Sequence, residues 1–106
     1  MRMSMNICLE YQYRDAGNFK NWGEIVFSNP TSLAPEFVTR MAEELLIDRE
    51  FFVASSARVP DLHFPDWKPD LDHDWHQFVA FRSTDEEPND REQRTIEDFV
   101  DSLRSA

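Results

Sequence analysis

The stretch MNICLEYQY, residues 5–13, decides the fold class because apolar and polar side chains alternate along it. Every second residue from Ile7 to Tyr13 is apolar, and the residues between them are Cys, Glu and Gln. An alternation of period two with one polar face is typical of a half-buried β-strand. We therefore expect a strand here that ends at about Arg14.

A turn and a second strand follow. Residues 14–18, RDAGN, are turn-forming, and we expect Gly17 to adopt the positive φ. A second apolar run predicts a strand from about Asn21 to Phe27, and Pro30 ends it because proline has no N–H for the ladder. The two strands are predicted to form a hairpin.

Residues 33–47 have the spacing of an amphipathic helix. Apolar side chains recur every four residues from Leu33 to Leu45, with further apolar residues widening the stripe. Ser32 is expected to cap this helix, and Pro35 lies in its first turn, where no intrahelical hydrogen bond is lost.

Two more strands and a second helix are predicted further along the chain. Residues 51–54 are apolar on both faces, which is typical of a central strand. Residues 59–74 contain three prolines and predict a long loop, and residues 75–81 alternate again as a fourth strand. Thr95 begins a capping box ahead of a helical apolar stripe over residues 96–103.

The predicted order is ββαββα, an α+β fold. One antiparallel four-stranded sheet with two helices packed on one face would bury all these apolar stripes together. The chain has 106 residues, of which 13% are aromatic, so we expect one domain over residues 1–106 with ample material for a core.

The net charge of -10 is concentrated in the second half of the chain. Residues 1–60 hold eight acids and six bases, whereas residues 61–101 hold 13 acids and four bases. Such a chain is repelled by duplex nucleic acid and by anionic membranes. A basic protein surface is the partner that this charge favours.

The sequence predicts a cytoplasmic protein. No run approaches the ~20 apolar residues of a membrane span, and the first residues lack the apolar core of a secretory signal. Cys8 is the only cysteine, which excludes an intrachain disulfide and favours a reducing compartment. An exposed edge strand could also pair two copies into a homodimer.

Histidine and aspartate gather between residues 61 and 76. The constellation comprises Asp61, His63, Asp66, Asp70, Asp72, His73, Asp74 and His76. Imidazole and carboxylate groups suit zinc, manganese or iron, so His63, His73 and His76 form a candidate metal site. In a strand, however, residues 73 and 76 would point to opposite faces. The alternative is a solvated acidic loop without an ion.

No catalytic site or cofactor is predicted. Cys8 lies beside the anionic Glu10, which disfavours a thiolate nucleophile. Ser55 and Ser56 follow a predicted strand but lack the GxSxG sequence of a nucleophile elbow. We therefore expect a protein that is not an enzyme.

The sequence favours a small accessory or regulatory module that binds another protein. Two groups of residues are candidates for its binding surface. The hairpin tip contributes Arg14, Asp15, Asn18, Lys20, Asn21 and Trp22, and the acidic turn contributes Asp85, Glu86, Glu87 and Asp90. Trp22 belongs either to this surface, where Trp and Arg are favoured, or to the core. A further alternative is a DNA mimic, in which carboxylates replace the phosphates of nucleic acid.

Several segments resemble, in the same order, motifs of a group of small bacterial proteins with no assigned activity. They are YRDAGNFKNWGE (13–24), EFFVA (50–54), VPDL (59–62), DHDWH (72–76) and TIEDF (95–99). The resemblance spans most of the chain and implies a bacterial origin. It carries no functional residue over to this sequence.

Overall fold

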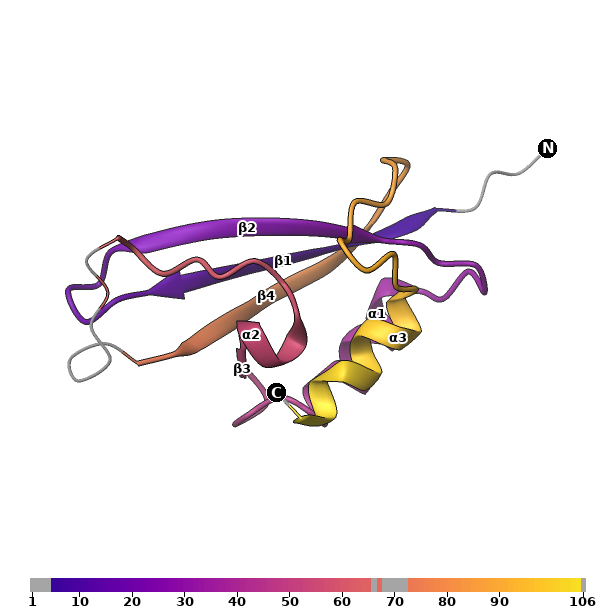
Figure 1. Cartoon of the computed structure of the whole chain (residues 1–106). Helices are drawn as coiled ribbons and strands as arrows, with labels where there is room; N and C mark the ends of the chain where they lie inside the picture. The colour runs from indigo at the N-terminus through magenta and orange to yellow at the C-terminus, as the bar shows by residue number, and fades with distance from the viewer. Residues whose placement is uncertain (1–4, 66, 68–72, 106) are drawn as a thin grey trace.

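A computed structural model describes residues 5–65, 67 and 73–105 of the chain (Figure 1). Its elements are β1 (Asn6–Arg14), β2 (Lys20–Phe27), α1 (Pro35–Glu43), β3 (Phe51–Val53), α2 (Ala54–Ala57), β4 (Trp75–Thr84), α3 (Ile96–Ser102) and a 3-10 turn at Leu103–Ser105. The predicted α+β class and ββαββα order are confirmed, and the four-residue α2 is an addition to them.

The four strands form one antiparallel sheet in the order β2-β1-β4-β3. β3 is therefore an edge strand, and its predicted central position was wrong. Its apolar character has a local explanation, because Phe52 packs into the core opposite His76 while Phe51 stacks on Trp75 at 5.5 Å. Phe52 is thus buried on one face of β3, whereas Phe51 and Val53 on the other face are half-buried.

A register shift between β1 and β4 changes which residues of β4 face the core. The pairing of β1 with β4 shifts between Glu10 and Tyr11, so that Leu9 lies opposite Phe81 and Tyr11 lies opposite Phe78. Phe78 and Phe81 consequently share the core face, with ring centroids 5.0 Å apart. Strict alternation along residues 75–81 predicts that these two rings lie on opposite faces. That prediction was wrong, because a β-bulge adds one residue to the strand and the sequence pattern does not reveal it.

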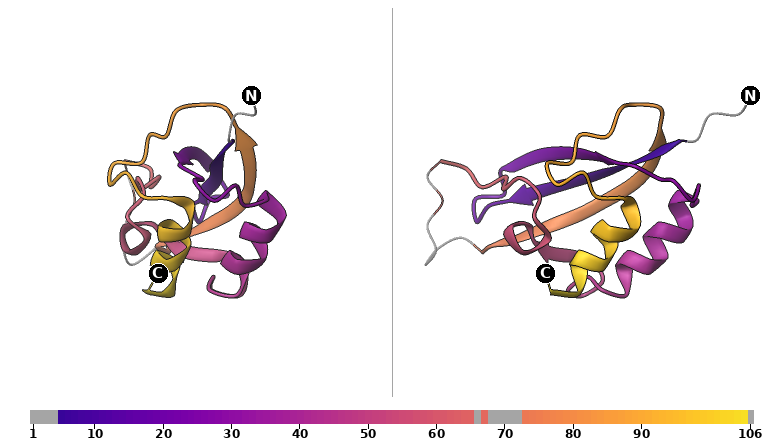
Figure 2. Two further views of the ribbon diagram at one scale, coloured as in Figure 1. Left: turned by 90° about the vertical axis from the view of Figure 1, so that its right-hand side faces the viewer. Right: turned by 45° about the vertical axis from the view of Figure 1, so that its right-hand side comes forward.

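Both α1 and α3 cover the same face of the sheet, as Figure 2 shows. The core between them is built from the predicted stripes. Its buried members include Ile7, Leu9, Tyr11, Phe27, Val38, Ala42, Phe52, Phe81, Ile96, Phe99, Val100 and Leu103. At about 25 cal/mol per Å² of apolar area, this shared burial is the main stabilising contribution to the fold.

The caps and turns correct some details of the prediction. α1 begins after Ala34, which has no side-chain capping bond, so Ser32 is not its cap. In the hairpin, Asn18 rather than Gly17 has the positive φ, at 67°. Thr95 does cap α3, because its side chain accepts a hydrogen bond from the N–H of Asp98 at 3.1 Å.

A buried ion pair joins the acidic turn to the rest of the molecule. The guanidinium of Arg94 contacts both carboxylate oxygens of Asp90 at 2.9 Å. Arg94 also donates to the carbonyls of Ala57 and Arg58, each at 2.7 Å, and lies over the ring of Phe99. Asp90 is therefore buried and has a structural role, unlike the exposed acids of the turn, and its part in a partner-binding surface stays a prediction.

Candidate metal centre

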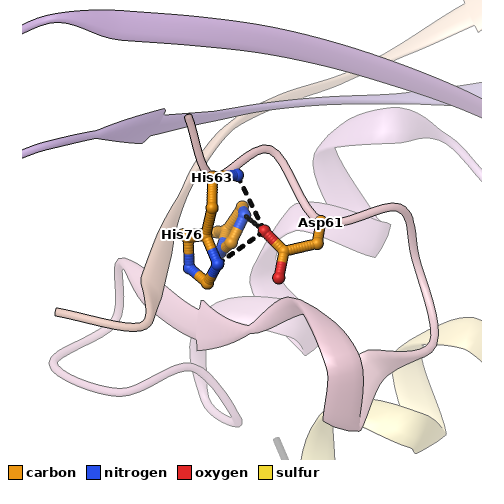
Figure 3. Close-up of side chains that lie close together, drawn as sticks. All are labelled: Asp61, His63 and His76. Atoms are coloured by element: carbon orange, nitrogen blue, oxygen red, sulfur yellow. Dashed lines mark hydrogen bonds and ion pairs between the residues drawn. The ribbon is translucent and has the colours of Figure 1, made fainter. Parts of the chain in front are cut away.

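Three side chains from two segments converge beside the sheet. Asp61 and His63 belong to the segment that follows α2, and His76 is the second residue of β4. One ligating atom from each residue lies within 4.8 Å of the others. Figure 3 shows the carboxylate of Asp61 directed at both imidazole rings.

Backbone and aromatic contacts hold the Asp61 segment in place. The hydroxyl of Tyr11 donates to the carbonyl of Pro60 at 2.7 Å. Gly23 lies opposite Tyr11 in the sheet, and a side chain there would come within 3.1 Å of Tyr11 and Leu62. The absence of a Cβ at Gly23 thus lets the segment lie close against the hairpin. Asp61 Oδ1 then accepts from the backbone N–H of His63 at 2.7 Å, which fixes the local turn.

The distances between the three side chains suit a tetrahedral ion. Asp61 Oδ1 lies 2.8 Å from His63 Nδ1 and 3.6 Å from His76 Nε2. Ligands bound at about 2.0–2.1 Å in tetrahedral geometry are about 3.3 Å from one another. The observed separations of 2.8 and 3.6 Å lie on either side of this value.

Oxygens of Asp74 lie against the other nitrogen of each ring. His76 Nδ1 is hydrogen-bonded to the Asp74 carbonyl at 3.2 Å. His63 Nε2 lies 3.0 Å from Asp74 Oδ1, close but not aligned as a hydrogen bond. Metal-binding histidines usually donate their second N–H to a carboxylate or a backbone carbonyl. For His76 this arrangement favours the tautomer with the proton on Nδ1, which leaves Nε2 unprotonated on the side of Asp61.

The environment of His76 keeps its ring neutral. The side chain is fully buried, and this burial lowers the pKa of His76 below its ordinary value of 6.5. Neutral imidazole is the form that binds metal, so a proton does not compete at neutral pH. His76 Nε2 accepts from the N–H of Leu62 at 3.0 Å, and an ion bound there would replace this hydrogen bond.

Two aromatic rings enclose His63. Tyr13 meets it edge-on at 4.6 Å between centroids, and Trp67 stacks on it at 4.3 Å. The Tyr13 hydroxyl and the Trp67 indole N–H both donate to the backbone carbonyl of His73, at 2.8 and 3.1 Å. The aromatic wall thus restrains the imidazole of His63 and connects its segment to the start of β4.

The three-histidine set predicted from the sequence is brought together only in part. His63 and His76 converge, whereas His73 lies outside the group, with its Nδ1 accepting from the N–H of Trp75 at 3.2 Å. Asp61 takes the third position. Asp66, Asp70 and Asp72, which the sequence placed in the same constellation, lie outside the described residues.

The residues of the predicted hairpin surface have different roles. Trp22 is 59% exposed and is not part of the core. Asp15 shapes the turn by accepting from the N–H of Phe19 at 2.8 Å, and Asn21 donates to the carbonyl of Leu62 at 3.2 Å. Arg14, Asn18 and Lys20 are exposed.

Arginines of the chain itself interrupt the predicted acidic surface. Glu86 lies 3.6 Å from Arg82, and Glu92 lies 3.2 Å from Arg58. Together with the buried Asp90, these pairs leave Asp85 and Glu87 as the exposed acids of the turn that lack a described arginine contact. Surface pairs of this kind reduce the local negative field. A DNA mimic needs continuous rows of carboxylates, and this alternative stays a prediction.

Cys8 is fully buried in β1. Burial raises the pKa of the Cys8 thiol to about 11, with Glu24 and Glu10 adding to the effect and Arg82 opposing it. The thiol is therefore protonated at neutral pH and is a poor nucleophile and a poor metal ligand.

No protein-family model, curated protein or solved structure matches this chain. In the part of the chain that the structure describes, no helix is long and apolar enough to cross a membrane.

Proposed function

We propose that the protein binds one divalent transition-metal ion, such as zinc, through Asp61, His63 and His76. The observation that carries the proposal is the meeting of two imidazole nitrogens on one carboxylate oxygen, at 2.8 and 3.6 Å. The contacts of Asp74 with the opposite ring nitrogens support it. A histidine that is merely buried needs neither a carboxylate nor a second imidazole beside it.

The donor set supports a transition metal over calcium or magnesium. Two nitrogens and one carboxylate oxygen suit zinc or iron(II), whereas calcium and magnesium prefer oxygen ligands throughout. Asp61 is half-exposed, so a fourth position on the ion would be open to water or to a small ligand.

The proposed role of the ion is structural rather than catalytic. It would join the segment at residues 61–63 to β4, two parts of the chain that are separated by the loop before Trp75. Tyr13 and Trp67 would close one side of the site, because both rings already contact His63. Metal binding would thereby hold the loop against the sheet.

Calorimetric titration of protein without a histidine tag tests the proposal. Zn²⁺ is expected to bind with a stoichiometry of one, and His63→Ala is expected to weaken binding at least about tenfold, since a ligand is lost. The matched control is His73→Ala, which removes an imidazole from the same segment but from outside the triplet.

The control variant is expected to bind Zn²⁺ as the unmodified protein does. Absence of stoichiometric binding, or an equal loss in the two variants, would contradict the proposed site. Circular dichroism of both variants establishes that each is folded before binding is compared.

A further inference from the structure

A groove runs between α1 and α3. Its residues come from these helices and their flanking segments, whereas the candidate metal centre lies in β4 and in the segment after α2. The volume of the groove is about 350 Å³. Its apolar lining consists of Leu33, Phe37, Met41, Leu45 and Val100. Phe37 is 51% exposed, which is unusual for a large aromatic side chain on a helix that packs against a core.

The rim of the groove is acidic. Among the described residues that line it are Glu44, Glu97 and Asp101, with Arg104 as the one cation. Arg104 lies 2.8 Å from Asp101 and offsets that carboxylate, which leaves Glu44 and Glu97 to set the sign of the field. An apolar floor between acidic edges complements a ligand that has an apolar face flanked by positive charge.

We propose that this groove binds an amphipathic helix of a partner protein, with lysine or arginine beside its apolar face. A helix in a groove is recognised through apolar anchors at i, i+3 or i+4, and i+7. α1 has nine residues and so is about 13 Å long, which matches two turns of a bound helix. A second copy of this chain is a poorer occupant, because each copy carries a net charge of -10.

This surface differs from the one that the sequence suggested. The hairpin tip and the acidic turn lie on other elements, and the groove depends on two helices brought together by the fold. The proposal is also independent of the metal site, since none of the lining residues is a proposed ligand.

The test is fluorescence anisotropy with a labelled 15-residue helical peptide of leucine and lysine, in which the leucines occupy one face. A peptide of the same composition with scrambled order serves as the reference. At an ionic strength of about 0.15 M, where the screening length is about 8 Å, the amphipathic peptide is expected to bind at least about tenfold more tightly.

Two pairs of variants locate the binding. Phe37→Ser is expected to weaken binding at least about tenfold, whereas Phe19→Ser, which alters an exposed phenylalanine of the hairpin, leaves it unchanged. Glu44→Lys is expected to weaken binding, whereas Asp85→Lys makes the same charge change away from the groove with little effect.

Three results would overturn the proposal. They are equal binding of the two peptides, absence of binding to both, and an equal response of Phe37→Ser and Phe19→Ser. Since both phenylalanines are exposed, thermal melts are expected to find both variants folded.

Discussion

Replacing Asp90 with asparagine lowers the free energy of unfolding by about 3–5 kcal/mol. The substitution keeps the size of the side chain but leaves the guanidinium of Arg94 buried without its counter-charge. That guanidinium joins three segments, because it also donates to the carbonyls of Ala57 and Arg58 and to the hydroxyl of Ser102 in α3. An uncompensated charge in this position is costly, since water cannot reach it to replace the carboxylate.

Urea unfolding measures this effect, and a second ion pair of the chain supplies the control. Asp101 and Arg104 are 2.8 Å apart but exposed, so Asp101→Asn is expected to cost less than about 1 kcal/mol. Equal costs at positions 90 and 101 would contradict a structural role for the buried pair.

The same pair predicts an acid dependence of stability. Burial alone would raise the pKa of Asp90, but hydrogen bonds from Arg94 outweigh it and hold the pKa below its ordinary value of 3.8. The contribution of Asp90 is therefore present above that value and is lost as the pH falls through the folded-state pKa. The Asp90→Asn variant is expected to lack this part of the acid dependence.

If the proposed site binds zinc, the melting temperature of the protein is expected to rise by about 10–20 °C at a free zinc concentration one hundred times the dissociation constant. Binding to the folded state alone contributes about 2.7 kcal/mol at that concentration. In a domain of this size each kcal/mol moves the midpoint by about 4–8 °C. Differential scanning calorimetry in the presence and absence of Zn²⁺ measures the shift.

The Asp61→Asn variant is expected to lose most of this shift. An asparagine oxygen still accepts from the N–H of His63, so the local turn is kept while the negative charge is removed. Magnesium is expected to produce no comparable shift, because the two nitrogen donors do not suit it. Stabilisation of Asp61→Asn to the same extent would exclude Asp61 as a ligand.

The elements with regular periodicity could be predicted from the sequence. The alternation in residues 5–13 marks β1, and the capping threonine at position 95 marks the start of α3. Each of these signals is local, since the side chains concerned act within a few residues. The edge position of β3 and the bulge at Val79 of β4 could not be predicted, because they depend on how distant strands pair.

The candidate metal centre could be predicted only in part for the same reason. The histidines were recognised by residue type. Whether His73 or Asp61 lies beside His63 and His76, however, depends on how the strands of the sheet pair. Facing inward on β4, His76 lies opposite Phe52 of β3, and that position brings its ring to the segment containing Asp61. The Asp-x-His spacing at positions 61 and 63 was the available sequence signal.

The buried ion pair of Asp90 and Arg94 was harder to predict from the sequence than the metal centre. A spacing of four residues is common for exposed pairs on helices, but here it lies in a segment before α3. The sequence analysis placed Asp90 with the other acids of the turn, because a count of acidic residues does not distinguish an acid that is paired with an arginine from one that is not. The carbonyls of Ala57 and Arg58 and the ring of Phe99 help to explain why this arginine is buried, and the two carbonyls are far away in the sequence.

The most direct test of the metal site is nitrogen NMR of the three histidine rings during addition of Zn²⁺. The proposed site predicts that one equivalent of Zn²⁺ changes the signals of His63 Nδ1 and His76 Nε2 and leaves the ring of His73 unaffected. Unchanged signals for His63 and His76, or a change confined to His73, would contradict it.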